Sequence, residues 1–106
     1  NIDVKTIILN EIKSFSSETN DYVKVDFSDL INQLLDKLYE LNIMSIIVEG
    51  GAFTINQFLN QNAYDEIRIF TTTKILKKGV KSPITPIIKK IYSNNDDGDL
   101  LEIYRK

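Results

Sequence analysis

Apolar and polar positions follow two different periods along the chain, and the change of period predicts alternating strands and helices. Residues 5–9 form a short, apolar, β-branched run that is typical of a buried strand. Residues 22–27 alternate between apolar and polar side chains, which predicts a second strand near a sheet edge. The stretch between them is rich in serine, threonine and asparagine and predicts a polar connection, with a turn of helix near Lys13 and Phe15.

A helical period replaces the alternation after residue 28. Ser28 has the chemistry of an N-cap, and Asn42 is a plausible stop at the other end. The apolar residues between them fall on one wide stripe: Leu30, Ile31, Leu34, Leu35, Leu38 and Leu41. We expect all six to be buried, each contributing roughly 1.5–3 kcal/mol, so that this helix forms a main part of the core.

The uninterrupted apolar run at residues 45–48 predicts a central strand covered on both faces. A strand, a helix and this strand would make a right-handed crossover with parallel pairing. After two glycines, the spacing of Phe53, Ile55, Phe58 and Leu59 predicts a second helix that ends near residues 60–62. Residues 65–73 predict a long strand, so the expected class is α/β with a mostly parallel sheet.

The last third of the chain predicts a loop and a hairpin. Residues 74–90 hold six lysines and no acidic residue, and Gly79, Pro83 and Pro86 interrupt regular structure. We expect a solvated surface loop, with neutralisation of a 2′-phosphate as the functional alternative. Residues 87–92 and 100–104 flank a turn-rich linker at 94–99, which predicts an antiparallel hairpin closing the sheet.

The candidate site is the turn Val48-Glu49-Gly50-Gly51 at the start of the second helix. Glycines let a ligand approach closely, and helix N-terminal amides favour anions such as phosphate. Glu49 would end a central strand, where open α/β sheets bind ligands, and an acceptor-only carboxylate suits the N–H edge of a heterocycle. The alternatives are a simple tight turn, and a salt bridge from Glu49 to a lysine or to Arg68.

Two further pairs of residues are weaker candidates for the site than the glycine turn and Glu49. Thr54 and Asn56 would add side-chain donors to the glycine turn. Asp65 and Glu66 would form a catalytic acid pair only if both faced one site, and adjacent strand residues face opposite ways. We therefore expect structural roles for these two carboxylates.

Composition narrows the chemistry. The chain has 106 residues, enough for one small domain, and a net charge of −2, which gives no basic footprint for nucleic acid. No apolar run approaches the ~20 residues that span a bilayer, and we expect no signal peptide and a cytoplasmic protein. Cysteine and histidine are absent, which excludes disulfides, thiolate nucleophiles, Ser-His pairs and the usual zinc sites. Difficult chemistry would belong to a cofactor or a carboxylate.

The landmarks Val48-Glu49-Gly50-Gly51, Phe58-Leu59 and Asp65-Glu66 resemble, in sequence and spacing, the C-terminal reductase domain of the bifunctional riboflavin-biosynthesis deaminase/reductase. The approach Asn42-Ile43-Met44-Ser45-Ile46-Ile47 and the run Lys77-Lys78-Gly79-Val80-Lys81-Ser82-Pro83 are also similar to that family. The resemblance runs from about Thr6 to the C-terminus. It implies a dihydrofolate-reductase-like fold, a mixed, mostly parallel sheet flanked by helices and ending in an antiparallel hairpin. Residues 1–106 would be the C-terminal portion of one such domain.

The resemblance also implies an activity, the NADPH-dependent reduction of the ribosyl group of 5-amino-6-(5-phosphoribosylamino)uracil to ribityl. By this resemblance Glu49 would contact the pyrimidine sugar phosphate. The turn and helix start would hold the NADP phosphates, through Gly50, Gly51, Ala52, Phe53, Thr54, Ile55, Asn56 and Gln57. The family's domain is about twice as long, so we expect weak or no activity from this chain alone, and we expect a homodimer. The alternatives are a non-catalytic oligomerisation or interaction fragment, and a related reductase of another pterin or pyrimidine.

Overall fold

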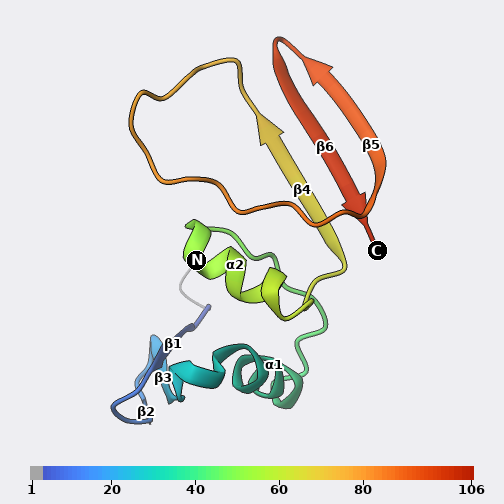
Figure 1. Ribbon diagram of the computed structural model, residues 1–106. Coiled ribbons are helices and arrows are strands. Elements are labelled where there is room, and N and C mark those ends of the chain that lie inside the picture. The colour runs from blue at the N-terminus through green and yellow to red at the C-terminus, as the bar shows by residue number, and fades with distance from the viewer. Residues whose placement is uncertain (1–3) are drawn as a thin grey trace. The chain divides into compact units, whose positions relative to one another are not determined.

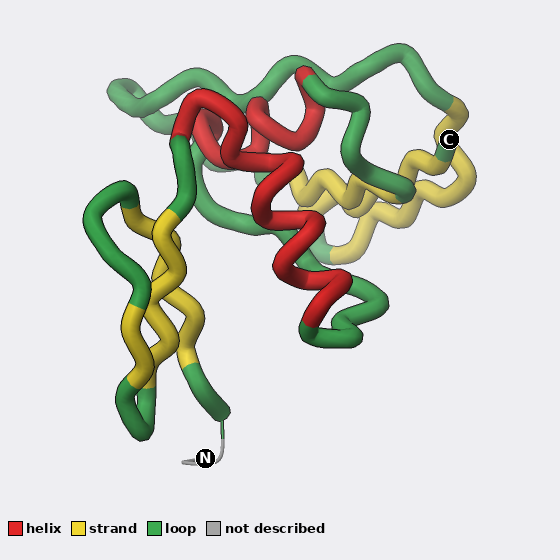
Figure 2. The backbone as a smooth tube through the Cα atoms, turned by 90° about the horizontal axis from the view of Figure 1, so that it is seen from below, coloured by secondary structure: helices red, strands yellow, loops and turns green. Residues whose placement is uncertain are grey.

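The computed structural model describes residues 4–106, in the order β1, β2, β3, a 3-10 turn, α1, α2, β4, β5, β6 (Figure 1). The chain divides into two compact units, Asn1–Ile46 and Ile47–Lys106. Each has its own three-stranded sheet, ordered β1-β3-β2 in the first unit and β4-β6-β5 in the second. Figure 2 shows each sheet as its own group of yellow strands. The class is therefore mixed α/β, as predicted.

The first sheet contains the parallel pairing of the described residues. β1 (Thr6–Asn10) lies parallel to β3 (Asn20–Lys24), and the short β2 (Phe15–Ser16) lies antiparallel to β3. Two predictions for this region are wrong. The expected turn of helix near Phe15 is a strand, since the Phe15 ring stacks on Tyr22 with ring centroids 4.4 Å apart. The strand expected at an edge is the central one of its sheet.

Helix α1 (Leu30–Glu40) forms where the apolar stripe predicts it. Its start differs from the prediction: Ser28 lies in the 3-10 turn before the helix, and the N-cap of α1 is Asp29, whose side chain makes no capping hydrogen bond. The Asp26 side chain accepts from the Ser28 backbone N–H at 2.9 Å and from the Ser28 hydroxyl at 2.7 Å, at a 3-10 turn (Phe27–Asp29) that leads into the helix. At the other end Asn42 has φ +58, and the amides of Asn42 and Ile43 donate to the carbonyls of Tyr39 and Leu38. These two bonds make a Schellman ending, so the predicted stop at Asn42 is confirmed.

The α1 stripe is less buried than predicted. Among its six apolar residues Ile31 is buried, with 1% of its surface exposed, whereas Leu35 and Leu41 remain 41% and 42% exposed. Leu30, Leu34 and Leu38 are half-buried. The expectation of six buried side chains is therefore wrong, because in the described residues too little chain packs over the outer part of the stripe.

The predicted strand at residues 45–48 is not formed. Residues 43–49 are assigned to no helix or strand, and Met44 and Ile47 are 99% and 90% exposed. The expected strand–helix–strand crossover with parallel pairing is therefore wrong for residues 4–106. A strand needs a neighbouring backbone to bond to, and no strand of the described chain pairs with this run.

The second unit contains α2 (Ala52–Asn60) and an antiparallel sheet of β4 (Glu66–Thr71), β5 (Lys89–Asp96) and β6 (Asp99–Arg105). The helix ends as α1 does, with Asn62 at φ +57 and the Asn62 and Ala63 amides donating to the carbonyls of Leu59 and Phe58. The predicted second helix, long strand and closing hairpin are confirmed, but β4 runs antiparallel to its neighbour and does not extend a parallel sheet.

The hairpin turn is tighter than its sequence suggests. Residues 94–96 and 99 belong to the strands, and Asp97 and Gly98 alone form the turn, with φ +50 and +85. Two positive φ values at the central positions are typical of a type I′ turn, which favours Asp-Gly and matches the twist of the strands. The predicted linker at 94–99 is therefore mostly strand.

Candidate functional site

The glycine turn and the start of α2 form a defined local structure within the second unit. Gly50 has φ +123, a region that side-chain-bearing residues rarely adopt, whereas Gly51 is the N-cap with an ordinary extended backbone, φ −77 and ψ 165. The Ile55 amide donates to the Gly51 carbonyl at 3.2 Å and makes the first helical bond. The amides of the three residues before it have no partner one turn earlier, as at the start of any helix.

Open space surrounds both glycines. A Cβ placed on Gly50 or on Gly51 would meet no atom of the protein within 4 Å. The positive φ of Gly50 explains why position 50 is a glycine. At position 51 neither the backbone angle nor packing in the described residues requires a glycine. A ligand that approaches the backbone closely would account for a residue without a side chain at this position.

The helix start presents a mixture of exposed and half-buried side chains. Phe53 is 77% exposed and Thr54 is exposed, so its hydroxyl is available to a ligand. Ala52, Ile55, Asn56 and Gln57 are half-buried, and Phe58 anchors the helix with 6% of its surface exposed. The structure thus brings the predicted residues from Gly50 to Gln57 together on one short segment, and their binding roles stay a prediction.

Glu49 lies exposed at the end of residues 43–49. Among residues 4–106 it takes part in none of the ion pairs, and Arg68, one partner proposed for it, is bound to Glu66 at 2.6 Å. The salt-bridge alternative is therefore wrong for the described structure. A solvated carboxylate one residue before the glycines remains available to a ligand, and its substrate role stays a prediction.

Glu66 holds two arginines and has a structural role, as expected. Its carboxylate accepts from the Arg68 Nε at 2.6 Å and from the Arg105 Nε at 2.7 Å, which ties β4 to the end of β6. The hydrogen bond from Arg68, followed by that from Arg105, lowers the pKa of Glu66. Asp65 is exposed, and its carbonyl accepts from the Lys106 amide at 3.3 Å. The two carboxylates do not form one acid pair.

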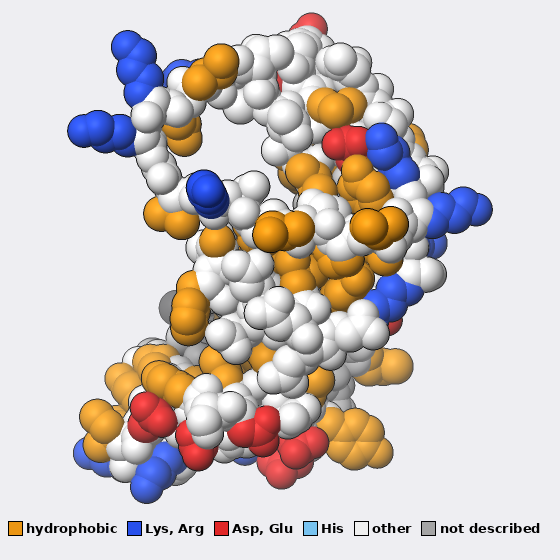
Figure 3. All heavy atoms as spheres, viewed as in Figure 1, with side chains coloured by type: hydrophobic (Ala, Val, Ile, Leu, Met, Phe, Trp, Pro, Cys, Tyr) orange, Lys and Arg blue, Asp and Glu red, His pale blue; other side chains and the backbone are white. Residues whose placement is uncertain are grey.

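The basic loop is a surface segment, as predicted. Residues 72–88 are assigned to no helix or strand, and Figure 3 shows lysine side chains in blue extending from this loop beside exposed hydrophobic ones. Its exposed apolar residues include Ile75, Leu76, Val80, Ile84 and Ile87. The role of this loop toward a 2′-phosphate stays a prediction.

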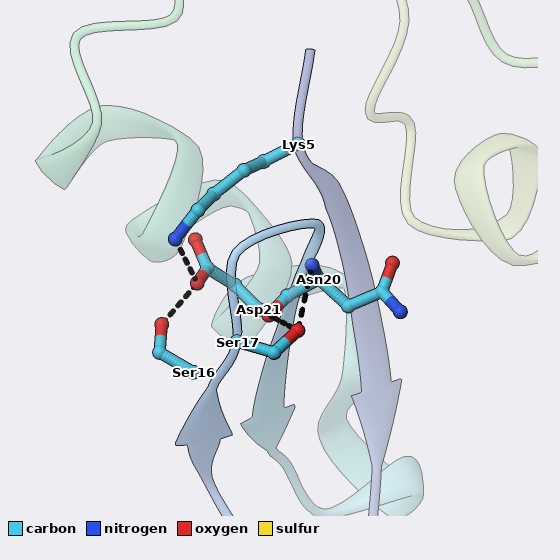
Figure 4. Close-up of polar contacts among 5 residues, drawn as sticks. All are labelled: Lys5, Ser16, Ser17, Asn20 and Asp21. Carbon is cyan, nitrogen blue, oxygen red and sulfur yellow. Dashed lines mark hydrogen bonds and ion pairs between the residues drawn. The ribbon is translucent and has the colours of Figure 1, made fainter. Parts of the chain in front are cut away.

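A polar cluster in the first unit was missed by sequence reasoning (Figure 4). Asp21 accepts from the Ser16 hydroxyl and from the Lys5 ammonium, the latter at 3.1 Å. These hydrogen bonds, that from Ser16 first, lower the pKa of Asp21. The Ser17 hydroxyl and the Asn20 backbone bond to each other at the turn between β2 and β3. The cluster joins β2 and β3 to Lys5, the residue before β1, so its role is structural. Only the pairing of β1 with β3 could have revealed it.

Two further kinds of feature are absent from residues 4–106. No helix there is long and apolar enough to cross a bilayer. No group of three or more carboxylates is arranged to hold a metal ion in the same residues. Within the described chain, the glycine turn with Glu49 is accordingly the strongest candidate.

In this chain a glycine turn leads into the N-terminus of α2, and no protein atom lies close to the two glycines. Proteins of the α/β class with such a turn can bind an anionic, phosphate-bearing ligand. The RibD C-terminal domain model matches residues 3–87, so this chain is a member of the RibD C-terminal domain family. The matched region includes the turn, α2 and β4.

Similar proteins agree with this assignment. The riboflavin biosynthesis protein RibD of Aquifex aeolicus (strain VF5) is 40% identical over 50 residues, which are 47% of this chain and 14% of that protein. The crystal structure of a diaminohydroxyphosphoribosylaminopyrimidine deaminase/5-amino-6-(5-phosphoribosylamino)uracil reductase from Thermotoga maritima has a TM-score of 0.76 at 23% identity, covering 95% of this chain and 30% of that one. A putative riboflavin biosynthesis protein from Shewanella sp. PV-4 has a TM-score of 0.70 at 17% identity, covering 95% and 59%.

These two structural likenesses show the fold alone. The chain spans a small part of the curated relative and less than two thirds of either solved chain. The activity of the longer proteins therefore bears on this chain as a proposal.

Proposed function

We propose that this chain is the cofactor-side part of a riboflavin-biosynthesis reductase, which uses a nicotinamide cofactor to reduce a phosphorylated ribosylaminopyrimidine. The cofactor is NADPH and the substrate is 5-amino-6-(5-phosphoribosylamino)uracil, the compound in the description of the Thermotoga maritima relative. Family membership over residues 3–87 supports the reaction class. The observation that carries the cofactor assignment is Gly51, a glycine for which the described chain supplies no conformational or packing reason.

The residues present fit a dinucleotide phosphate. Free amides at the start of α2 would donate to phosphate oxygens, and the partial positive charge of a helix N-terminus favours them. The exposed Thr54 hydroxyl would add a donor, and the open space at Gly50 and Gly51 leaves room for the backbone to approach the phosphate. The nicotinamide would supply the hydride. Glu49 would accept a hydrogen bond from the N–H edge of the pyrimidine.

Calorimetric titration of the chain with NADPH and with NADH tests the cofactor assignment. We expect NADPH to bind, and Gly51→Val to weaken it at least tenfold, because a branched side chain would occupy the space of the phosphate. The Gly51 backbone tolerates valine, so the fold should persist. Gly79→Val is the matched control in the loop, where the nearest atom to an added Cβ is a Leu76 side-chain carbon at 3.9 Å.

Two results would count against the cofactor assignment: no detectable NADPH binding, or equal affinity of the chain and of Gly51→Val. Catalysis is measured separately, by NADPH oxidation with the pyrimidine substrate. We expect weak or no turnover from this chain alone. Turnover near that of a full-length deaminase/reductase would refute the view that the chain holds part of the site.

A further inference from the structure

The turn of the closing hairpin joins an aspartate to a glycine. Asp97 and Gly98 form it with φ +50 and +85, and both residues are exposed. Figure 1 shows this turn at the opposite end of the hairpin from the C-terminus. In the whole sequence, no other aspartate or asparagine precedes a glycine. The pair therefore differs from every other aspartate of the chain in the reactivity that a following glycine gives to an aspartyl side chain.

The Gly98 amide nitrogen lies next to the side-chain carboxyl carbon of Asp97 along the chain, so that a bond between them closes a succinimide ring. A Cβ on residue 98 would crowd this approach, and glycine has none. Asp96 and Asp99 pair with each other and close the ladder, so Gly98 stands outside it. The backbone bonds found in the turns and loops of residues 4–106 include none from the Gly98 amide. The nitrogen can thus react without the loss of a strand hydrogen bond.

We propose that Asp97 is a site of spontaneous isomerisation to isoaspartate. The Gly98 nitrogen attacks the side-chain carbonyl carbon of Asp97 and forms a C–N bond, while the amide proton and the carboxyl hydroxyl leave together as water. Water then opens the succinimide ring at one of its two carbonyls. Opening at the side-chain carbonyl restores aspartate, whereas opening at the main-chain carbonyl leaves isoaspartate, in which the backbone runs through the former side chain. One water leaves and one enters, so the reaction needs no further reactant.

The product changes the turn in which it forms. Isoaspartate adds one carbon to the backbone, and a two-residue loop sets the register of both strands through its length and twist. The hydrogen-bonded pairs beside the turn are Asp96 with Asp99 and Asn94 with Leu101. We expect these pairs to open first, so that isomerisation loosens the end of the hairpin that carries the turn.

Incubation of the purified chain at neutral pH tests the site. Peptide mapping by mass spectrometry distinguishes isoaspartate from aspartate, and water enriched in heavy oxygen labels the carboxyl group each time a succinimide is opened. We expect isoaspartate at position 97 and at least about tenfold less at the other aspartates, because each of those precedes a residue with a Cβ. Asp96 and Asp99 are the closest internal controls, since both are exposed in the same hairpin.

Two variants separate the nucleophile from the turn. Gly98→Asn should keep the turn, because asparagine adopts positive φ more readily than most residues and the nearest atom to an added Cβ is a Thr73 methyl carbon at 3.8 Å. It should slow isomerisation at Asp97 about tenfold, since its side chain hinders the approach of the amide. Asp97→Gly removes the reacting carboxyl, fits φ +50 and should abolish the product at position 97. Hydrogen exchange at the Leu101 amide measures whether each variant keeps the hairpin.

A free peptide with the sequence of residues 94–101 gives the rate without a folded turn, and Gly98→Asn in that peptide repeats the comparison independently of folding. We expect the chain to isomerise within about tenfold of the peptide, because no ladder bond protects the Gly98 amide. Hydrogen exchange at Leu101 should speed up as isoaspartate accumulates. The proposal is overturned by a chain in which Asp97 stays intact while the peptide isomerises. Equal rates with and without Gly98→Asn, or as much isoaspartate at Asp96 as at Asp97, would also overturn it.

Discussion

The two glycines of the turn should respond in opposite ways to alanine. Gly50 at φ +123 would force a Cβ into a strained backbone, at a cost of about 1–3 kcal/mol. Gly51 at φ −77 accepts a Cβ without strain, and no atom lies within 4 Å of it. In both variants the unfolded chain loses freedom, which stabilises the fold by about 0.4–1 kcal/mol.

The net expectation is a loss of about 1 kcal/mol or more of unfolding free energy for Gly50→Ala and a gain of about 0.5 kcal/mol for Gly51→Ala. Urea denaturation followed by circular dichroism measures this difference, which corresponds to a midpoint separation of about 1 M. Hydrogen exchange at the Phe58 and Leu59 amides reports the same change within α2.

The same denaturation experiment is repeated with NADPH present, to measure how much the ligand stabilises each variant. A cofactor at one hundred times its dissociation constant stabilises the folded chain by about 2.7 kcal/mol. We expect NADPH to give this increment to the parent chain and Gly51→Ala to lose a large part of it, although that variant is the more stable one without ligand. Equal stability changes for the two alanine variants would refute the backbone argument. An undiminished NADPH increment in Gly51→Ala would refute the argument for close approach.

Three further changes test other parts of the structure. The lowered pKa of Glu66 means that its charged form stabilises the fold above about pH 4.5 and that this contribution is lost as pH falls through the folded value. Glu66→Gln should therefore flatten the acid limb of the stability curve in pH-dependent urea titrations. Asp26→Ala should destabilise the fold in the same denaturation assay, and Ser28→Ala less, since the Asp26 carboxylate caps the 3-10 turn that precedes α1. Phe58→Ala should cost about 3–5 kcal/mol, whereas the exposed Phe53→Ala should change stability little; equal effects would contradict the burial difference.

Local signals in the sequence predicted local structure well. Both helices follow the apolar period, and both end at an asparagine in the left-handed conformation, as the Asn42 and Asn62 turns show. The closing hairpin follows from Asp97-Gly98, a pair that fits two positive φ values. Each of these features depends on residues within a few positions of one another.

Strand pairing was predicted poorly because it depends on distant segments. β1 pairs in parallel with β3, although a polar stretch containing β2, and not a helix, connects them. β4 pairs antiparallel with β6, a strand that begins 28 residues after β4 ends, a choice that no local pattern of β4 specifies.

The candidate site combines one residue whose position is fixed with one whose position is not. Gly51 is held by the first helical bond of α2, so the amides beside it point in a defined direction whatever precedes them. Glu49 follows residues 43–49, where an apolar run has found no strand to pair with in the described chain. A carboxylate that orients a substrate needs a rigid backbone beneath it. We therefore expect α2 and its turn to form the phosphate side of the proposed site, whereas the substrate side depends on a strand that would hold residues 45–48 in place.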